Sequence, residues 1–190
     1  ITAQIFVGYN IIRIYNPINA INKANITYTS SLITLKENEI GDTKDITDMK
    51  PLVDSPEAYI MYNDANKDEF YLLENRQLKG FDSALYGHGL LVFHVDYDKL
   101  AWESNKVNVV SSRQRVTIIP ADGKKETSVS SLKSDPFPGP LGVTALTDKT
   151  TPAAILYNTN LNGTRFMGKP IEDISEDADG YISFKALYPE

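Results

Sequence analysis

The sequence of 190 residues contains no cysteine and only two histidines, His88 and His94. Without cysteine the chain has no disulfide framework, no thiolate nucleophile and no thiolate metal ligand. The two histidines do not form the zinc motif His-Glu-x-x-His, which needs histidines at i and i+4 of one helix and a glutamate as general base. Cysteine chemistry and a zinc site of that type are therefore excluded from this sequence.

Clustered positive charge and long apolar runs are also missing. The chain carries 19 Lys and Arg against 25 Asp and Glu, for a formal net charge of −6, and its basic residues are scattered. Nucleic-acid binding needs clustered Lys and Arg, so the composition argues against it. No apolar run approaches the ~20 residues of a membrane-spanning helix. No Gly-x-Ser-x-Gly motif and no glycine-rich phosphate loop is present either.

Signals for β-structure dominate what is there. Tyr and Phe are frequent, ten prolines leave few windows for a long helix, and Asp-Gly or Asn-Gly turns recur. Strands are predicted at residues 4–8, 11–15, 25–29, 31–36, 58–62, 69–75, 90–95, 115–120 and 181–186. Short helical turns are predicted at 17–23 and 98–104, and a long loop at 123–140. The expected fold is mainly β, with antiparallel sandwich-like sheets, long loops and little helix.

The chain divides into an N-terminal segment that cannot be assigned to a domain and a longer part that can. Residues 1–25 form an unplaced N-terminal segment, for which a β-hairpin is the natural interpretation. Residues 26–190 form one β-rich domain, a size that a single hydrophobic core can support. Because the chain begins at Ile1 rather than methionine, we expect a part of a longer polypeptide in preference to a processed mature chain.

A series of motifs resembles a known family. The blocks are Tyr-Leu-Leu-Glu-Asn-Arg-Gln at 71–77, Gly-Phe-Asp at 80–82, Gly-His-Gly-Leu-Leu-Val-Phe-His-Val-Asp at 87–96, Ser-Asp-Pro-Phe-Pro-Gly at 134–139, Lys-Pro-Ile-Glu-Asp-Ile-Ser-Glu at 169–176 and Asp-Gly-Tyr-Ile-Ser-Phe at 179–184. In order and content they resemble the region downstream of the zinc site in secreted zinc metallopeptidases of the immune inhibitor A type. Weaker similarity begins near residue 46, and residues 1–25 match nothing recognisable.

The resemblance implies a role without catalysis in this chain. It identifies residues 26–190 with the C-terminal part of the peptidase domain, which would pack on the zinc-bearing half and shape the substrate cleft. The zinc ligands and general base of the family have no counterpart here, so the chain is expected to be inactive alone. The resemblance also implies a secreted or cell-surface bacterial protein, protein or peptide substrates, and zinc only in the full-length enzyme.

His88 and His94 allow three interpretations. A metal pair, completed by Asp96 or Asp82, is disfavoured because residues six apart on a straight strand lie about 20 Å apart, whereas one ion needs ligands about 2 Å away. A structural interpretation has His94 partly buried and hydrogen-bonded. A third interpretation places His94 and Asp96 on the wall of the substrate cleft in the complete peptidase.

Charged residues after the apolar run at 70–73 predict a structural clamp. Glu74 and Arg76 face the same side of a strand. The planar guanidinium of Arg76 can hold a carboxylate through two hydrogen bonds. We expect the charges at 74 and 76 to pair with Asp82 or Asp96 and to fix the loop at 78–87. A substrate-contacting arginine is the alternative.

Three oxygen-bearing residues, Asp64, Asn66 and Asp68, begin like a calcium loop. The EF-hand pattern fails, because its glycine and final glutamate positions hold Glu69 and Asn75. A calcium site of another type, formed by these residues or by acidic residues at 177 and 179, remains one interpretation. A polar turn is the other.

A rival function uses the aromatic residues. Trp102, Tyr97, Tyr86, Phe81 and Phe137 together are candidates for a sugar-stacking platform, although aromatics in a β-rich chain mostly belong to the core. On this view the chain is an extracellular binding module for a glycan or a protein, acting through these rings or through the loop at 123–140. An inactive relative that serves as a scaffold or inhibitor is a third interpretation.

Overall fold

The computed structural model describes residues 3–7, 10–14, 26–28, 31–33, 36–125 and 128–188. Strands make up most of the regular structure, and the helices are short. This confirms the expected mainly β fold. No helix among the described residues is long and apolar enough to span a membrane.

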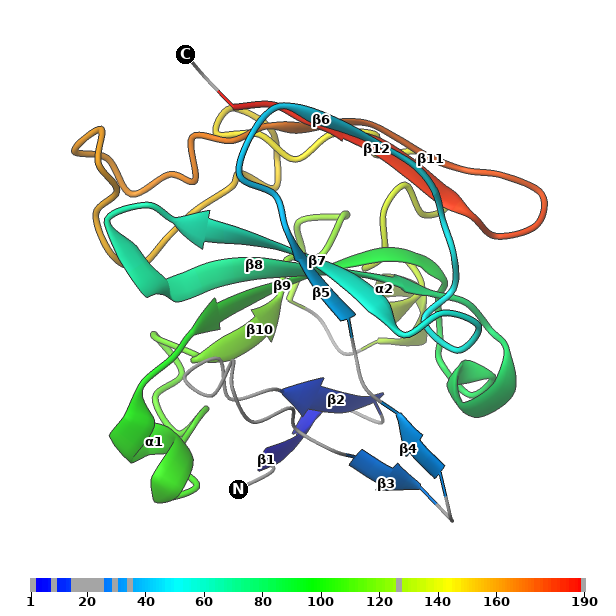
Figure 1. Ribbon diagram of the computed structural model, residues 1–190, viewed down its shortest axis with the longest axis horizontal. Helices are drawn as coiled ribbons and strands as arrows, with labels where there is room; N and C mark the ends of the chain where they lie inside the picture. Colours follow the sequence, from blue (N-terminus) through cyan, green and yellow to red (C-terminus); the bar gives the residue numbers. More distant parts are fainter. Residues whose placement is uncertain are drawn as a thin grey trace.

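A five-stranded sheet forms the centre of the molecule (Figure 1). Its order is β10 (Val116–Ile118), β9 (Gly89–Asp96), β8 (Asn66–Arg76), β7 (Glu57–Asn63) and β5 (Lys36–Glu39). Neighbouring strands are antiparallel except β5 and β7, which are parallel. The sheet is thus mixed at one edge, where the sequence predicts only antiparallel pairing.

A three-stranded antiparallel sheet packs over one face of the central sheet. It consists of β11 (Ile171–Glu176), β12 (Ile182–Ala186) and β6 (Lys44–Met49), in that order. Figure 1 shows these strands as a separate layer above β7, β8 and β9. The two layers make the sandwich-like arrangement that the strand pattern predicts.

Two small hairpins lie on the opposite side of the central sheet (Figure 1). One pairs β1 (Ala3–Val7) with β2 (Asn10–Ile14), and the other pairs β3 (Ile26–Tyr28) with β4 (Ser31–Ile33). The first hairpin coincides with the pairing predicted for the N-terminal segment. The helical turn predicted at 17–23 lies outside the described residues.

The central sheet separates two hydrophobic clusters. Between the sheets lie Met61, Tyr71, Leu73, Leu90, Val92, Phe137, Ile171, Ile174, Ile182 and Phe184, with further buried neighbours. On the other face lie Ala58, Ile60, Phe70, Leu72, Leu91, Phe93, Val95, Tyr97, Trp102, Val107 and Val116. Every residue of β9 is buried, which explains why residues 90–93 are continuously apolar instead of alternating.

Short helices lie within the connections. The helix η2 (Gly80–Asp82) follows β8, and α1 (Lys99–Glu103) follows β9 at the predicted turn. The helix α2 (Val129–Leu132) lies inside the stretch predicted as a long loop. That stretch is anchored to the sheet, because Phe137 and Leu90 exchange two backbone hydrogen bonds of 2.7 and 2.9 Å.

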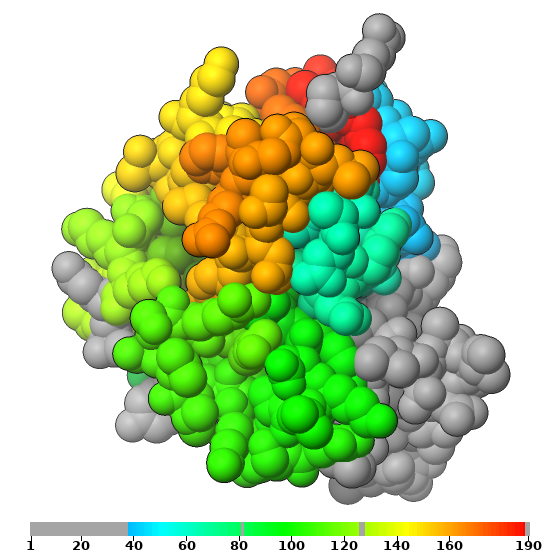
Figure 2. Space-filling model, turned by 90° about the vertical axis from the view of Figure 1, so that its left-hand side faces the viewer, coloured from blue at the N-terminus to red at the C-terminus, as the bar shows by residue number. Residues whose placement is uncertain are grey.

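At one end of the sandwich three segments distant in sequence meet. Figure 2 shows the turn between β7 and β8 (turquoise), the segment after β9 (green) and the stretch around residue 160 (orange) in contact on one face. The residues beneath this junction form the polar cluster described in the next section.

We predict that the stretch at 123–140 is an integral part of the core. Replacing fully buried Phe137 by alanine should lower the free energy of unfolding by about 3–5 kcal/mol, because it removes an aromatic ring and leaves a cavity. Urea denaturation monitored by circular dichroism measures this loss. The matched control, exposed Leu141→Ala, should change stability by less than about 0.5 kcal/mol; equal small effects would show that the stretch is a peripheral loop.

Candidate functional site

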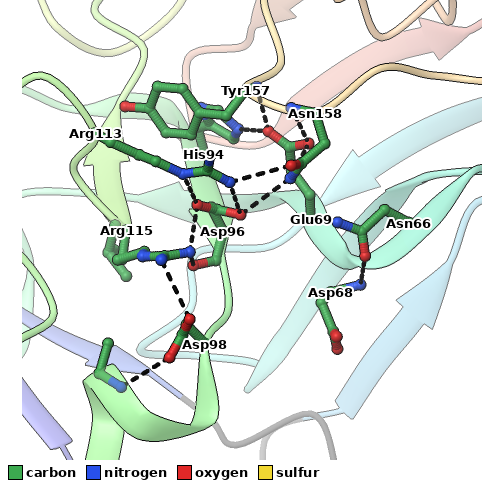
Figure 3. A network of polar contacts seen from close by, with 12 residues as sticks. Asn66, Asp68, Glu69, His94, Asp96, Asp98, Arg113, Arg115, Tyr157 and Asn158 are labelled. Carbon is green, nitrogen blue, oxygen red and sulfur yellow. Dashed lines mark hydrogen bonds and ion pairs between the residues drawn. The ribbon is translucent and has the colours of Figure 1, made fainter.

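The most polar part of the interior lies where β8 begins and β9 ends. Glu69 of β8 stands directly opposite Asp96 of β9, and Tyr71 stands opposite His94. All four side chains are buried. Residues directly opposite one another point to the same face of a sheet, where two like charges repel. The two carboxylates therefore require several donors in a confined space (Figure 3).

Donors from several parts of the chain surround Glu69. One carboxylate oxygen accepts from His94 Nε2 at 2.7 Å and from the Tyr157 backbone N–H. The other accepts from Asn63 Nδ2 at 3.1 Å and from the backbone N–H and Nδ2 of Asn158 at 3.0 and 3.1 Å. Burial by itself would raise the pKa of Glu69, but these hydrogen bonds lower it to about 2.

Asp96 is held by two arginines. Arg113 reaches its carboxylate with Nε at 2.8 Å and Nη2 at 3.1 Å, and Arg115 with Nη1 at 2.7 Å. Arg115 also contacts Asp98 at 3.2 Å. The pKa of Arg113 is raised, first by its hydrogen bond to Asp96. The arrangement is charge-assisted and forked on the Arg113 side, the geometry in which arginine binds carboxylates most strongly.

Asn158 joins the two carboxylates. Its Nδ2 donates to Glu69 at 3.1 Å and to Asp96 at 3.2 Å, while its Oδ1 accepts from Arg113 Nη2 at 3.1 Å. One neutral side chain thus separates two negative charges and also contacts the cation. Because Asn158 lies far from β8 and β9 in sequence, this bridge fastens an irregular segment to the central sheet.

Aromatic rings enclose the histidine. The ring of Tyr157 lies 4.7 Å from that of His94 at 30°, and the ring of Tyr71 lies 5.5 Å away at 76°. The guanidinium of Arg113 lies 5.4 Å from the Tyr157 ring, within the range of a cation–π contact. Burial raises the pKa values of both tyrosines. Neither phenol is therefore prepared to act as a base near neutral pH.

The chemistry of this cluster is that of a structural cross-link. Glu69 is ionised and hydrogen-bonded, Asp96 is hydrogen-bonded to two arginines, and His94 is enclosed between Glu69 and Tyr157. His94 and Asp96, which one interpretation places on a cleft wall, are both buried in this chain. Their role in a cleft of a complete peptidase stays a prediction.

The residues of the predicted clamp lie together at the other end of β8. Arg76 contacts Glu74 through Nη2 at 2.7 Å and Nε at 2.9 Å. It contacts both oxygens of Asp82 through Nη1, at 3.0 and 3.2 Å. Burial tends to lower the pKa of Arg76, but the charges of Glu74 and Asp82 raise it above its ordinary value. The second proposed partner, Asp96, binds Arg113 and Arg115 instead.

Polar side chains at the turn between β7 and β8 accept hydrogen bonds from other protein groups. Asp64 accepts from the buried Lys169 at 2.7 Å, and Asn66 accepts from the backbone N–H of Asp68 at 3.2 Å. Burial lowers the pKa of Lys169, although Asp64 opposes this effect. Within the described part of the chain, no group of three His, Asp or Glu residues is arranged to hold a metal ion. Calcium binding stays an untested interpretation.

His88 and His94 do not face a common site. His88 is exposed at the start of the loop into β9, and its Nδ1 lies 2.7 Å from Glu176 Oε1. That contact connects the loop to β11. His94 lies in the buried cluster with Glu69. The straight-strand argument against a shared metal ion therefore agrees with the positions of the two side chains.

The aromatic platform suggested by the sequence is wrong. Trp102 and Tyr97 are buried together on one face of the central sheet, with ring centroids 5.0 Å apart. Phe137 is buried on the opposite face, between the sheets. The rings serve two separate cores, as hydrophobic burial favours. Tyr86 is partly buried, and the side chain of Phe81 lies outside the described residues.

Several members of the buried cluster have no signal in the sequence analysis. Glu69 enters the sequence analysis only as the first residue of a predicted strand, and Asn158 has no local pattern that distinguishes it. Arg113 and Arg115 belong to the basic residues that the sequence scatters along the chain. A carboxylate at the start of an apolar strand was the one local sign that Glu69 would be buried, but its partners could not be inferred.

We predict that Glu69 makes stability depend on pH. Its folded pKa of about 2 lies below the ordinary 4.5, so its contribution is complete above pH 4.5 and is lost as the pH falls toward 2. The loss amounts to about 3 kcal/mol. Glu69→Gln should remove this pH-dependent part of the free energy of unfolding. It should also lower the free energy of unfolding by about 2–3 kcal/mol at pH 7, because the glutamine NH2 group would face the donors that now bind the carboxylate. Urea denaturation from pH 7 to 2 measures both effects.

The control for that experiment is Glu103→Gln. Its side chain is exposed and lies 3.8 Å from Lys99, so the substitution should change stability by less than about 0.5 kcal/mol. If the free energy of unfolding of Glu69→Gln depended on pH in the same way as that of the unmodified chain, the proposed role of the buried carboxylate would be contradicted.

A second prediction concerns the clamp. Arg76→Ala should destabilise the chain by about 3–5 kcal/mol, because it leaves the buried Glu74 carboxylate without its cation. Lys79→Ala removes an equally short contact with Asp54, but this pair is exposed, so the loss should stay below about 1 kcal/mol. Thermal and urea denaturation of both variants measure the loss of stability. Similar losses in the two variants would show that Arg76 stabilises the chain no more than an exposed lysine does.

The chain matches no protein-family model, and no curated protein or solved structure matches it either. The interpretation of the buried cluster therefore rests on its own geometry, and the resemblance to the immune inhibitor A type of peptidase stays a prediction from the motifs in the sequence.

Proposed function

We propose that this chain is the non-catalytic C-terminal part of a secreted bacterial zinc metallopeptidase. In this proposal it packs on the zinc-bearing half of the same polypeptide and shapes one side of the substrate cleft. The resemblance of the ordered motifs to peptidases of the immune inhibitor A type carries the proposal.

The distribution of those motifs in the fold supports it. The blocks at 71–77, 87–96, 169–176 and 179–184 coincide with β8, β9, β11 and β12. The block at 134–139 contains Phe137, which bonds to β9. Motifs that resemble one family in order thus contribute two strands to each of the two facing sheets. Chance similarity would not be expected to concentrate in the elements that pack together.

The state of the charged groups supports the non-catalytic part of the proposal. A general base must be within hydrogen-bond reach of a substrate proton, and its pKa is best near the working pH. Glu69 has a pKa of about 2 and is enclosed by donors, while Asp96 is bound by two arginines. Glu69 in this state stabilises the fold and is a poor base, and the arginines occupy both carboxylate oxygens of Asp96. The catalytic groups of the proposed enzyme would come from its other half.

The alternative is an extracellular module that binds a glycan or a protein. Burial of Trp102, Tyr97 and Phe137 removes the rings on which the glycan version depended. The version that uses the stretch at 123–140 keeps its candidate surface, but none of the residues described there carries a group directed toward a ligand that would favour it over the peptidase proposal.

The test combines the reading frame of the source with an activity measurement. We expect the frame to continue upstream into a His-Glu-x-x-His helix, and the purified 190-residue chain to leave casein and fluorogenic peptides uncleaved, with or without added zinc. Intact-mass and N-terminal sequencing of the natural protein check the first expectation. Proteolysis by the purified chain that disappears with a chelator would refute the non-catalytic assignment. A frame without the zinc motif would favour the binding-module alternative.

A further inference from the structure

Lys169 is the one buried lysine among those whose side chains the structure describes. Its side chain is 4% exposed, whereas those of Lys67 and Lys79, which also form ion pairs, are 61% exposed. An ammonium group in a protein interior is unfavourable unless its charge is compensated or its proton is lost. Burial is the main cause that lowers the pKa of Lys169, although Asp64 opposes it. The position therefore shifts Lys169 toward the neutral amine, which is the nucleophilic form of lysine.

A carboxyl group lies in direct contact with this amine. Lys169 Nζ is 2.7 Å from Asp64 Oδ1 and 2.7 Å from the backbone oxygen of Tyr62. The carboxyl carbon of Asp64 is one bond beyond Oδ1, so the nitrogen and the carbon that it would attack are neighbours. Holding two reactants in this way replaces the bimolecular encounter that makes amide formation slow in water.

The contact joins two parts of the fold that are distant in sequence. Asp64 lies in the turn between β7 and β8 of the central sheet, and Lys169 lies 105 residues later, just before β11 of the second sheet. The ring of Tyr188 lies 4.6 Å from Nζ and excludes water from that side. Because the chain has no cysteine, a disulfide cannot fasten the two sheets, and a covalent bond between these side chains would do so.

An exposed ion pair shows that a short distance alone does not select a lysine for this chemistry. Lys79 Nζ also lies 2.7 Å from a carboxylate, that of Asp54, but the two side chains are 61% and 35% exposed. Water solvates the ammonium group of Lys79, so no cost of burial favours the neutral amine there. Burial of the lysine is thus the property that distinguishes the pair formed by Lys169 and Asp64.

From this geometry we infer that Lys169 and Asp64 form an intramolecular isopeptide bond. A proton passes from the ammonium group to the carboxylate, and the resulting amine attacks the carboxyl carbon of Asp64. The bond between Nζ and that carbon forms, a C–O bond of the carboxyl group breaks, and one water molecule leaves, with no oxidation or reduction. Since the Asp64 side chain is 38% exposed, the water can leave to the solvent. The one remaining hydrogen on Nζ continues to bond to the Tyr62 oxygen.

Mass spectrometry tests the bond directly. A protease digest of the protein isolated from its source should contain a linked pair of peptides that carries Asp64 and Lys169. The pair should be about 18 Da lighter than the two separate peptides together, because one water is lost. The denatured 190-residue chain should show the same loss in its intact mass. Separate linear peptides for both residues, together with an intact mass that includes the water, would overturn the inference.

Substitutions identify the atoms that are joined. Lys169→Arg keeps a cation beside Asp64 but replaces the amine by a poorly nucleophilic guanidinium, and Asp64→Ala removes the carboxyl group. Each variant should show its full, unreduced mass. The matched control Lys79→Arg removes the amine of an equally short but exposed pair, and it should retain the loss of about 18 Da.

A loss of water that persists in Lys169→Arg, or that disappears in Lys79→Arg, would place the bond elsewhere and overturn the inference. If Lys169→Arg or Asp64→Ala does not fold, the peptides of the unmodified protein still decide the question. The inference is independent of the proposed function, because the linked peptides are expected whether or not a zinc motif precedes the chain.

Discussion

The buried carboxylate of Glu69 is the constraint on which much of this structure depends. Moving an ion into a protein interior costs several kcal/mol unless charges and hydrogen bonds compensate for it. Here compensation comes from His94 on the next strand, from Asn63 across the hairpin and from two consecutive backbone N–H groups at 157 and 158. Meeting the needs of one charge therefore orders a segment without regular structure that lies nearly ninety residues further along the chain.

A buried carboxylate that binds a connecting segment lies near each end of β8. Glu69 lies near its start and fixes the segment around Asn158, and Glu74 lies near its end and joins Arg76 in holding Asp82 of η2. Between them the strand is apolar on both faces and fills both hydrophobic clusters. The hydrophobic residues give the sheets their stability, while the carboxylates determine where the connecting segments lie. That division explains why charged residues flank the most apolar part of the sequence.

How far the sequence predicts this structure depends on the range of each interaction. The strands β8 and β9 follow from their apolar runs, and the clamp could be proposed because its members lie two to six residues apart. The strands β6 and β11 were not predicted, because polar residues outnumber apolar ones in both. Each is also interrupted by an aspartate with positive φ, Asp48 at 54° and Asp173 at 53°. The partners of Glu69 could not be predicted, because they are brought together only by the fold.

The buried cluster also fixes the position of the segment that follows β9. Asn158 links the Glu69 carboxylate to that of Asp96, and Asp96 binds Arg113 and Arg115. These arginines lie in that segment, so charge pairs deep in the sheet fix the position of a surface at its edge. A general base must reach a proton of the substrate, whereas Glu69 and Asp96 are buried and their oxygens accept hydrogen bonds from the protein itself. Burial and these hydrogen bonds are the strongest physical reason for assigning the cluster a role in positioning the segments around residues 113 and 158.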